Sequence, residues 1–212
     1  MSKTRARSPE KKEKQFRKII QEGRKLFLEF GSDGLSMRVL AKKLGMQQGN
    51  LYNYVQSKRE LWFAVITEDF QLFTSKMQKI ITQHQNTKMD LLEKVGSFYI
   101  DFALEDLERY RMLFLTTAPP STSIGPIESN YQPLSFDFML QIVQEAIEKG
   151  ELSGVEPSKF TIFIWGIIHG NISLLQPESL FPKQYAQKLD YQNKYGDFLK
   201  QQIKRILASY SK

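Results

Sequence analysis

Apolar residues recur at helical spacing along most of this chain, and strand-like alternation is rare. Between residues 16 and 30 they follow intervals of three and four, which is typical of one buried helix face. Ser8-Pro9-Glu10 has the composition of a helix start, because it supplies a capping hydroxyl, a proline in the first turn and an acid. Gly31 and Gly34 follow the last apolar position, so the pattern predicts a first helix over residues 9–30.

Residues 36–61 combine small, turn and apolar positions at spacings that an ordinary helical hairpin does not need. Ala41 is small where two helices would cross, Gly45 permits a turn, and Leu51 supplies an apolar anchor for the helix that follows. Ser57-Lys58-Arg59-Glu60 has the residues of a capping box, which opens another helix. The pattern predicts a helix-turn-helix directed at the major groove of DNA, followed by a long helix.

The rest of the chain is also predicted to be helical. Further helices are expected over residues 91–102, 107–115, 134–147, 160–175 and 195–210. Residues 116–133 hold four prolines and one glycine and are expected to form a long loop, which is either functional or simply mobile. Residues 160–175 are apolar on nearly every side, so their helix has to be covered by its own domain or by a second subunit.

Composition narrows the class of protein. The chain has 212 residues, is 41% hydrophobic and contains no cysteine, which excludes disulfides, thiol catalysis and thiolate metal sites. It shows no secretory signal and no apolar run long enough to cross a bilayer, so we expect a cytoplasmic protein with no membrane partner.

Residues 1–60 carry a net charge of +9 and residues 61–212 a net charge of −2. The excess positive charge therefore accompanies the helix-turn-helix, where phosphate neutralisation needs it, although a merely solubilising basic tail is the alternative.

The side chains expected to contact DNA bases lie on the second helix of the motif, at about residues 47–53. Amides both donate and accept hydrogen bonds, as the major-groove edge of adenine requires. The amide side chains of this segment are Gln47, Gln48, Asn50 and Asn53. Gly49 would let the backbone approach the groove closely.

Further contacts are expected to DNA phosphates. Tyr52 and Tyr54 carry hydroxyls that reach phosphate oxygens, although Tyr54 is equally well explained as a core residue. Lys58 lies beside the free N–H groups of a helix N-terminus, a combination that favours phosphate. Ser36, a candidate N-cap, and Arg38 open the first helix of the motif and are expected to touch the phosphate backbone.

These segments resemble the TetR family of one-component bacterial transcriptional regulators. The resemblance is specific over residues 12–72, which include LFLEFG, LSMRVLAKKLGMQQGNLYNYVQSKRELW and the run Gly49–Tyr54 followed by Lys58. YRMLF at 110–114 and WGIIHG at 165–170 resemble a C-terminal subgroup with a Trp…His-Gly signature. The family usually has an aromatic residue where this chain has Val55, a departure that affects packing only. The resemblance assigns DNA contacts to Gln47, Gln48, Asn50, Tyr52 and Lys58.

The resemblance also implies a fold and a mechanism. It implies an all-α protein of about nine helices, with a three-helix DNA-binding domain at 12–72, a basic arm at 1–8 before it, and a larger ligand-binding and dimerisation domain at 73–212. Dimers would form through helices near 158–175 and 195–210 and bind a palindromic operator. A small apolar or aromatic effector would release the repressor from DNA by moving the helix that begins at Ser57.

Effector binding is assigned to aromatic and apolar residues of the predicted helical core. The candidates are Trp62, Ile66, Phe70, Phe98, Phe102, Trp165 and His169. Each of them is also explained as plain core, and His169 as a core or interface histidine. No cofactor and no metal site is expected.

Two other functions remain open at this point. One is a helical DNA-binding protein that senses no small molecule. The other is an all-α enzyme with a purely structural helix-turn-helix, which is less favoured because the chain has no recognisable catalytic or phosphate-binding motif. Equal affinity for random and selected DNA would contradict the regulator hypothesis.

Overall fold

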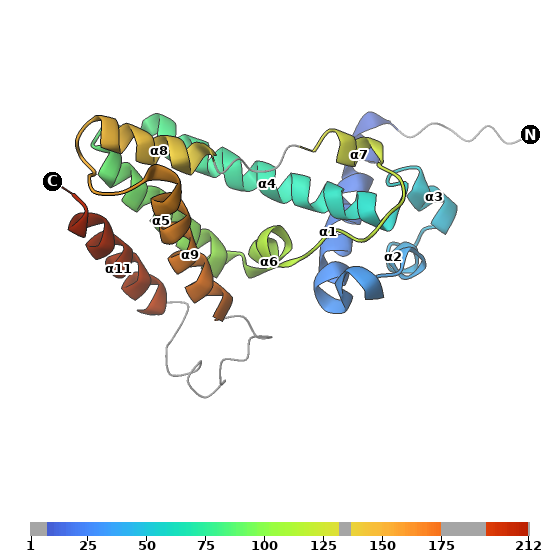
Figure 1. Cartoon of the computed structure of the whole chain (residues 1–212). Coiled ribbons are helices and arrows are strands. Elements are labelled where there is room, and N and C mark those ends of the chain that lie inside the picture. Colours follow the sequence, from blue (N-terminus) through green and yellow to red (C-terminus); the bar gives the residue numbers. More distant parts are fainter. Residues whose placement is uncertain (1–7, 132–136, 175–193, 212) are drawn as a thin grey trace, which may run out of the picture. The chain divides into compact units, whose positions relative to one another are not determined.

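The computed structural model describes residues 8–131, 137–174 and 194–211, and the expected basic arm falls largely outside these ranges (Figure 1). The described chain is helical, and the strand-type pairing found in it is one isolated β-bridge between Leu152 and Ser211. The all-α fold is confirmed. Within the described ranges there are ten helices, which are α1 (Pro9–Gly34), α2 (Met37–Lys43), α3 (Gln48–Tyr52), α4 (Lys58–Gln83), α5 (Lys88–Glu105), α6 (Leu107–Leu115), α7 (Pro126–Ser129), α8 (Asp137–Glu148), α9 (Pro157–Leu174) and α11 (Gly196–Ser209).

The chain divides into two compact units. Unit 1 comprises Met1–Leu72 and Glu108–Pro133, and unit 2 comprises Phe73–Leu107 and Leu134–Lys212. α4 runs through both units, because its N-terminal part belongs to unit 1 and its C-terminal part to unit 2. Unit 1 therefore holds more than the predicted DNA-binding segment, since α6 and the residues around α7 belong to it as well.

Unit 1 has a continuous apolar core built from α1, α2, α3 and the start of α4. Its fully buried side chains include Ile19, Phe27, Leu40, Leu51 and Leu61. These residues are the apolar positions of the sequence pattern, so hydrophobic burial explains why the four helices assemble.

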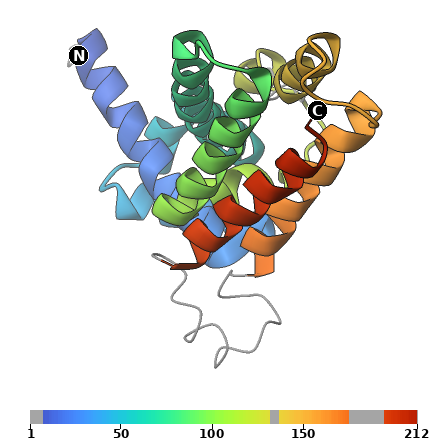
Figure 2. The ribbon, with the colours of Figure 1, turned by 90° about the vertical axis from the view of Figure 1, so that its left-hand side faces the viewer.

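Unit 2 is a helical bundle centred on α5. α5 contacts α8, α9 and α11, and α9 also contacts α8 and α11. Figure 2 shows α9 (orange) and α11 (red) side by side next to α5 (green). Leu91, Val95 and Ile100 of α5 are buried in this bundle.

Three details differ from the sequence-based expectations. The predicted loop at 116–133 contains a short helix, α7, which begins at Pro126 because proline suits the first turn of a helix. Gly31 has a φ of 70°, so the regular part of α1 ends at the predicted residue 30, and one further turn runs to Gly34. α9 begins at Pro157, three residues before the expected start.

Candidate nucleic-acid interface

The turn between α2 and α3 depends on Gly45. Its φ of 62° lies in the left-handed region, which glycine adopts without steric cost. The Gly45 N–H donates to the Lys42 carbonyl (3.1 Å) and the Met46 N–H to the Ala41 carbonyl (3.0 Å). This pair of hydrogen bonds is the Schellman arrangement that ends a helix, and it fixes the direction in which the chain enters α3.

Apolar contacts hold α3 against the rest of unit 1. Ala41, the small residue predicted at the helix crossing, is buried, and Leu51 and Val55 are completely inaccessible to solvent. Val55 therefore fills the core position although it is aliphatic where the family usually has an aromatic residue. With these positions buried, the polar side of α3 faces solvent.

The residues predicted to contact DNA are largely exposed. The exposed ones are Ser36, Arg38, Gln47, Gln48, Gly49, Asn50, Tyr52 and Asn53. Gln47 is the N-cap of α3 and Asn53 is its C-cap, so the predicted range 47–53 spans the helix and both of its caps. Ser36 occupies the N-cap position of α2, but its side chain forms no capping hydrogen bond, which leaves its hydroxyl available for another role.

The two tyrosines of this segment differ. Tyr52 is 41% exposed, and its hydroxyl accepts a hydrogen bond from Gln48 Nε2 at 3.3 Å. Tyr54 is half-buried and stacks on Phe16 of α1, with ring centroids 6.5 Å apart. Tyr54 thus packs partly against the core, which was the alternative left open by the sequence.

The first turn of α4 follows the candidate interface directly. Ser57 Oγ accepts a hydrogen bond from the Glu60 N–H at 3.0 Å, as a capping box requires. The Glu60 carboxylate, however, accepts from the N–H of Gln56 at 2.9 Å and not from that of Ser57. Lys58 is half-buried, and its ammonium donates to the Asp33 carbonyl at 3.2 Å.

A buried ion network ties α1 and α6 to α4 within unit 1. The Arg24 guanidinium binds both carboxylate oxygens of Asp69 and also Glu68, and Arg109 Nε donates to Asp69 Oδ1 at 3.0 Å. Burial opposes the charge of Arg24, but the hydrogen bonds and charges of Asp69 and Glu68 outweigh it and raise its pKa. The bidentate geometry resists rotation of α1 against α4, so the network stiffens the scaffold behind α3.

The residues predicted to bind an effector fall into both units. In unit 1, Trp62 donates from Nε1 to Thr116 Oγ1 at 3.1 Å, Ile66 is buried, and Phe70 lies 6.3 Å from Phe114, centroid to centroid. In unit 2, Phe98 and Phe102 both pack against Phe73, at centroid distances of 5.2 and 5.0 Å. These contacts are those of packed aromatic clusters.

The other two expected effector residues form a polar chain in unit 2. Trp165 Nε1 donates to the Tyr99 hydroxyl at 3.3 Å, and that hydroxyl lies 3.1 Å from His169 Nδ1. The indole and imidazole rings also lie against each other, 5.3 Å apart. Burial lowers the pKa of His169, which favours its neutral form.

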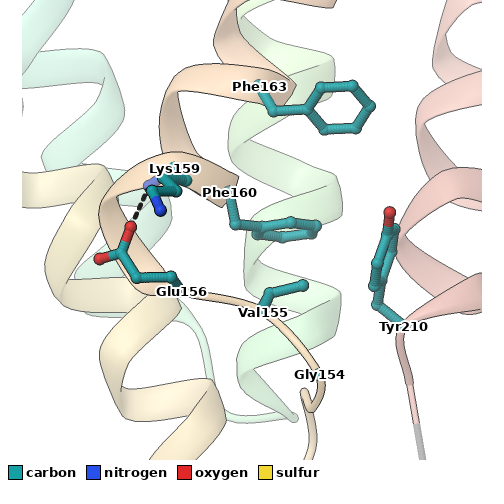
Figure 3. Close-up of a pocket in the computed structure, with 7 residues that line it drawn as sticks. All are labelled: Gly154, Val155, Glu156, Lys159, Phe160, Phe163 and Tyr210. Carbon is teal, nitrogen blue, oxygen red and sulfur yellow. Dashed lines mark hydrogen bonds between the residues drawn. The ribbon is translucent and has the colours of Figure 1, made fainter.

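Unit 2 contains a small cavity of about 240 Å³ beside the start of α9 (Figure 3). Phe160, Phe163 and Tyr210 provide its aromatic walls, and the Glu156 carboxylate accepts from the Lys159 N–H at 2.9 Å. That hydrogen bond and one from the Ser158 N–H lower the pKa of Glu156. The predicted effector residues do not line this cavity.

The described part of the chain contains no cluster of three or more histidine, aspartate or glutamate side chains that would hold a metal ion. None of its helices is long and apolar enough to cross a membrane.

Models of protein families match two parts of the chain. Residues 19–65 match the family described as bacterial regulatory proteins, tetR family, and residues 92–190 match the tetracyclin repressor-like C-terminal domain. A curated relative, an HTH-type transcriptional regulator of Staphylococcus aureus (strain USA300), is 37% identical over 94 residues, which is 44% of this chain. The chain spans about half the length of the curated relatives it matches.

Solved structures share the fold at low sequence identity. FadR of Bacillus subtilis, solved with stearoyl-CoA, superposes with a TM-score of 0.67 at 18% identity and covers 93% of this chain and 100% of its own. AibR, solved with isovaleryl coenzyme A and operator DNA, gives a TM-score of 0.61 at 19% identity and covers 82% of this chain and 95% of its own.

Proposed function

Because this chain belongs to the TetR family of bacterial transcriptional regulators, we propose that it is a repressor that binds a palindromic operator as a homodimer and leaves it when an effector binds. The observation that carries the proposal is the exposed polar side of α3, held by a buried core within a segment that carries a large positive charge.

In this proposal the amides of Gln47, Gln48, Asn50 and Asn53 contact base edges in the major groove, and Gly49 allows close approach. Phosphates are bound by the hydroxyls of Tyr52 and Ser36, by Arg38 and by Lys58, while Tyr54 adds a contact from its exposed edge. All of these residues except Tyr54 and Lys58, which are half-buried, are exposed, and this exposure supports the assignment because groups buried in the core cannot reach DNA.

Dimerisation is assigned to α9 and α11, the helices expected near 158–175 and 195–210. Both helices expose large apolar side chains, among them Ile162 (56% exposed), Phe163 (48%) and Phe198 (51%). Exposed apolar groups of this size on neighbouring helices support a subunit interface. A symmetric pair of recognition helices would then match a palindromic site.

The candidate effector residues are taken within each unit by itself, which gives Trp62, Ile66 and Phe70 in unit 1 and Phe98, Phe102, Trp165 and His169 in unit 2. FadR and AibR were solved with acyl-coenzyme A molecules, so acyl-CoAs of different chain length are the first compounds to screen. Release of bound DNA by one of them would identify the class. A chain that binds DNA specifically but is released by none would favour a DNA-binding protein without a sensing function.

Selection of bound duplexes from a random pool tests the proposal. We expect a palindromic consensus, bound with affinity that falls steeply with salt. Replacing Gln47, Asn50 and Tyr52 together by alanine removes the preference for that duplex, whereas Gln78→Ala, an exposed amide elsewhere on α4, leaves it unchanged. Equal binding of random and selected duplexes by the wild-type protein contradicts the proposal.

A further inference from the structure

Residues 116–131, which we call the brace, are bound to α1 and α4 at several points. Trp62 Nε1 donates to Thr116 Oγ1, Ser32 Oγ donates to the Thr117 carbonyl, and Arg59 Nη1 donates to the Pro119 carbonyl at 2.9 Å. Ala118, Ile127 and Tyr131 pack against the apolar core of unit 1. The brace lies far from the helix-turn-helix in sequence, yet it belongs to the same compact unit.

Arg59 joins the brace to the first turn of α4 through its charge. Its Nε lies 2.9 and 2.8 Å from the two carboxylate oxygens of Glu128, and its Nη2 donates to the same carboxylate. The guanidinium also lies over the Phe63 ring, 5.1 Å from the centroid. Hydrogen bonds from Arg59 hold the pKa of Glu128 below its usual range, so the pair is charged near neutral pH. Arg59, although it is next to Lys58, therefore binds a carboxylate of the same unit.

Glu60 makes the second connection, and it does so from a buried position. Its side chain is 2% exposed, and one carboxylate oxygen accepts from the Gln56 N–H at 2.9 Å. The other oxygen accepts from the Ile127 N–H at 2.8 Å, so one carboxylate joins the start of α4 to the start of α7.

Gly125 allows the brace to approach this carboxylate closely. A Cβ at residue 125 would lie 2.6 Å from Glu60 Cδ, a distance at which one of the two groups must move. Ile127, whose N–H donates to Glu60, is the second residue after Gly125. We therefore expect a methyl group at residue 125 to displace the Glu60 carboxylate, which also accepts from the Gln56 N–H.

We propose that Glu128 and Gly125 are positioning residues for operator binding, acting through Arg59 and Glu60 on the first turn of α4. This turn carries Lys58 and follows α3 after five residues, so fixing it sets where the phosphate contact lies relative to the recognition helix. The proposal rests on the proposed function and adds that DNA affinity depends on residues more than 60 positions beyond the helix-turn-helix.

In the first test, the charge effect and the positioning role predict opposite changes in DNA affinity. Glu128→Ala removes one negative charge from the DNA-binding unit, so electrostatics alone predicts tighter binding. The positioning role of the brace predicts weaker binding, because Arg59 loses its partner and the first turn of α4 loses its support. We expect affinity for the selected operator to fall about fivefold or more. Glu29→Ala is the matched control, since Glu29 is an exposed acid of the same unit whose ion pair with Lys43 is long, at 3.7 Å.

Gly125→Ala provides a second test without a change of charge. We expect weaker operator binding and faster hydrogen exchange at the amides of Gln56 and Ile127, which both donate to Glu60. Ser129→Ala is the control within α7, because it removes only an exposed hydrogen bond to the Pro126 carbonyl. Circular dichroism and thermal unfolding of each variant show whether the fold is kept.

The outcomes separate the two proposals. Suppose that the wild-type protein binds the operator specifically and that both Glu128→Ala and Gly125→Ala bind it equally well or more tightly. This result contradicts the positioning role of the brace and leaves the proposed function standing. Equal weakening by the Glu29→Ala and Ser129→Ala controls overturns the positioning role as well. A wild-type protein that does not prefer the selected duplex overturns the proposed function and, with it, this role of the brace.

Discussion

Lys58 is the proposed phosphate-contacting residue for which the loss of a single charge has the most direct expected consequence for DNA binding. Lys58 is the first residue of α4, where the N–H groups of a helix N-terminus favour phosphate, and its ammonium donates to the Asp33 carbonyl at 3.2 Å. We expect Lys58→Gln to weaken binding to every duplex by a similar factor. The slope of log affinity against log salt falls by about 0.9, the value for one lost phosphate contact to duplex DNA.

Titration of labelled duplexes at several salt concentrations measures this slope. Lys79→Gln is the matched control, because Lys79 is an exposed lysine farther along α4. An unchanged slope in Lys58→Gln contradicts the assignment of a phosphate contact to this residue.

Glu60 illustrates which part of a residue's role the sequence reveals. Ser57 and Glu60 are three positions apart, so local geometry alone predicts that they cap the same helix, and the Ser57 contact is confirmed. The hydrogen bond to the Ile127 N–H joins residues 67 positions apart, and no local rule predicts it. Exposure of the polar side of α3 was predictable from the sequence, because it depends only on the buried apolar residues close to it in the chain.

At the scale of elements, the crossing of α1 and α4 depends on Gly23. A Cβ at this residue would lie 2.9 Å from Leu61 Cδ1, and both residues are buried. We expect Gly23→Val to lower the free energy of unfolding by about 1–3 kcal/mol, the usual cost of overpacking a core. Chemical denaturation measures the change, and Gln21→Val, an exposed position of the same helix, controls for a β-branched residue in a helix. A loss no larger than that of the control contradicts tight packing at this crossing.

The periodicity of apolar residues predicts the long helices and misses the four-residue helix α7. α1, α4, α5, α8, α9 and α11 each bury one face or more, so their residues repeat at intervals of three and four. α7 has four residues and none of them is fully buried, so it leaves no period in a proline-rich segment. Its hydrogen bonds to α4, together with the packing of Ile127 against the core of unit 1, explain why it has a defined place.

At the scale of the molecule, the sequence predicts two parts but not their exact membership. The change of charge near residue 60 and the family resemblance mark a DNA-binding segment at 12–72. The structure adds residues 108–133 to the first unit, because Met112 is buried in its core and Arg59 and Glu60 bind the chain around α7. Contacts between distant segments decide this grouping, and single-sequence patterns carry no information about them.

Dimerisation gives the last prediction, because a palindromic operator is bound tightly only when two recognition helices are joined. Ile162 on α9 is 56% exposed, and an acid there places a charge on the apolar side of that helix without disturbing the core of unit 2. We expect Ile162→Asp to be monomeric in sedimentation velocity. The control variant Ile124→Asp, which replaces an apolar residue that is 74% exposed beside α7, remains dimeric.

Joining two sites adds about 100-fold or more in avidity, so wild-type protein prefers the full palindrome to a half-site by a factor of that order. The preference disappears in Ile162→Asp, because each monomer then binds one half-site independently. A dimeric Ile162→Asp variant that keeps the wild-type preference contradicts the assignment of α9 to the interface.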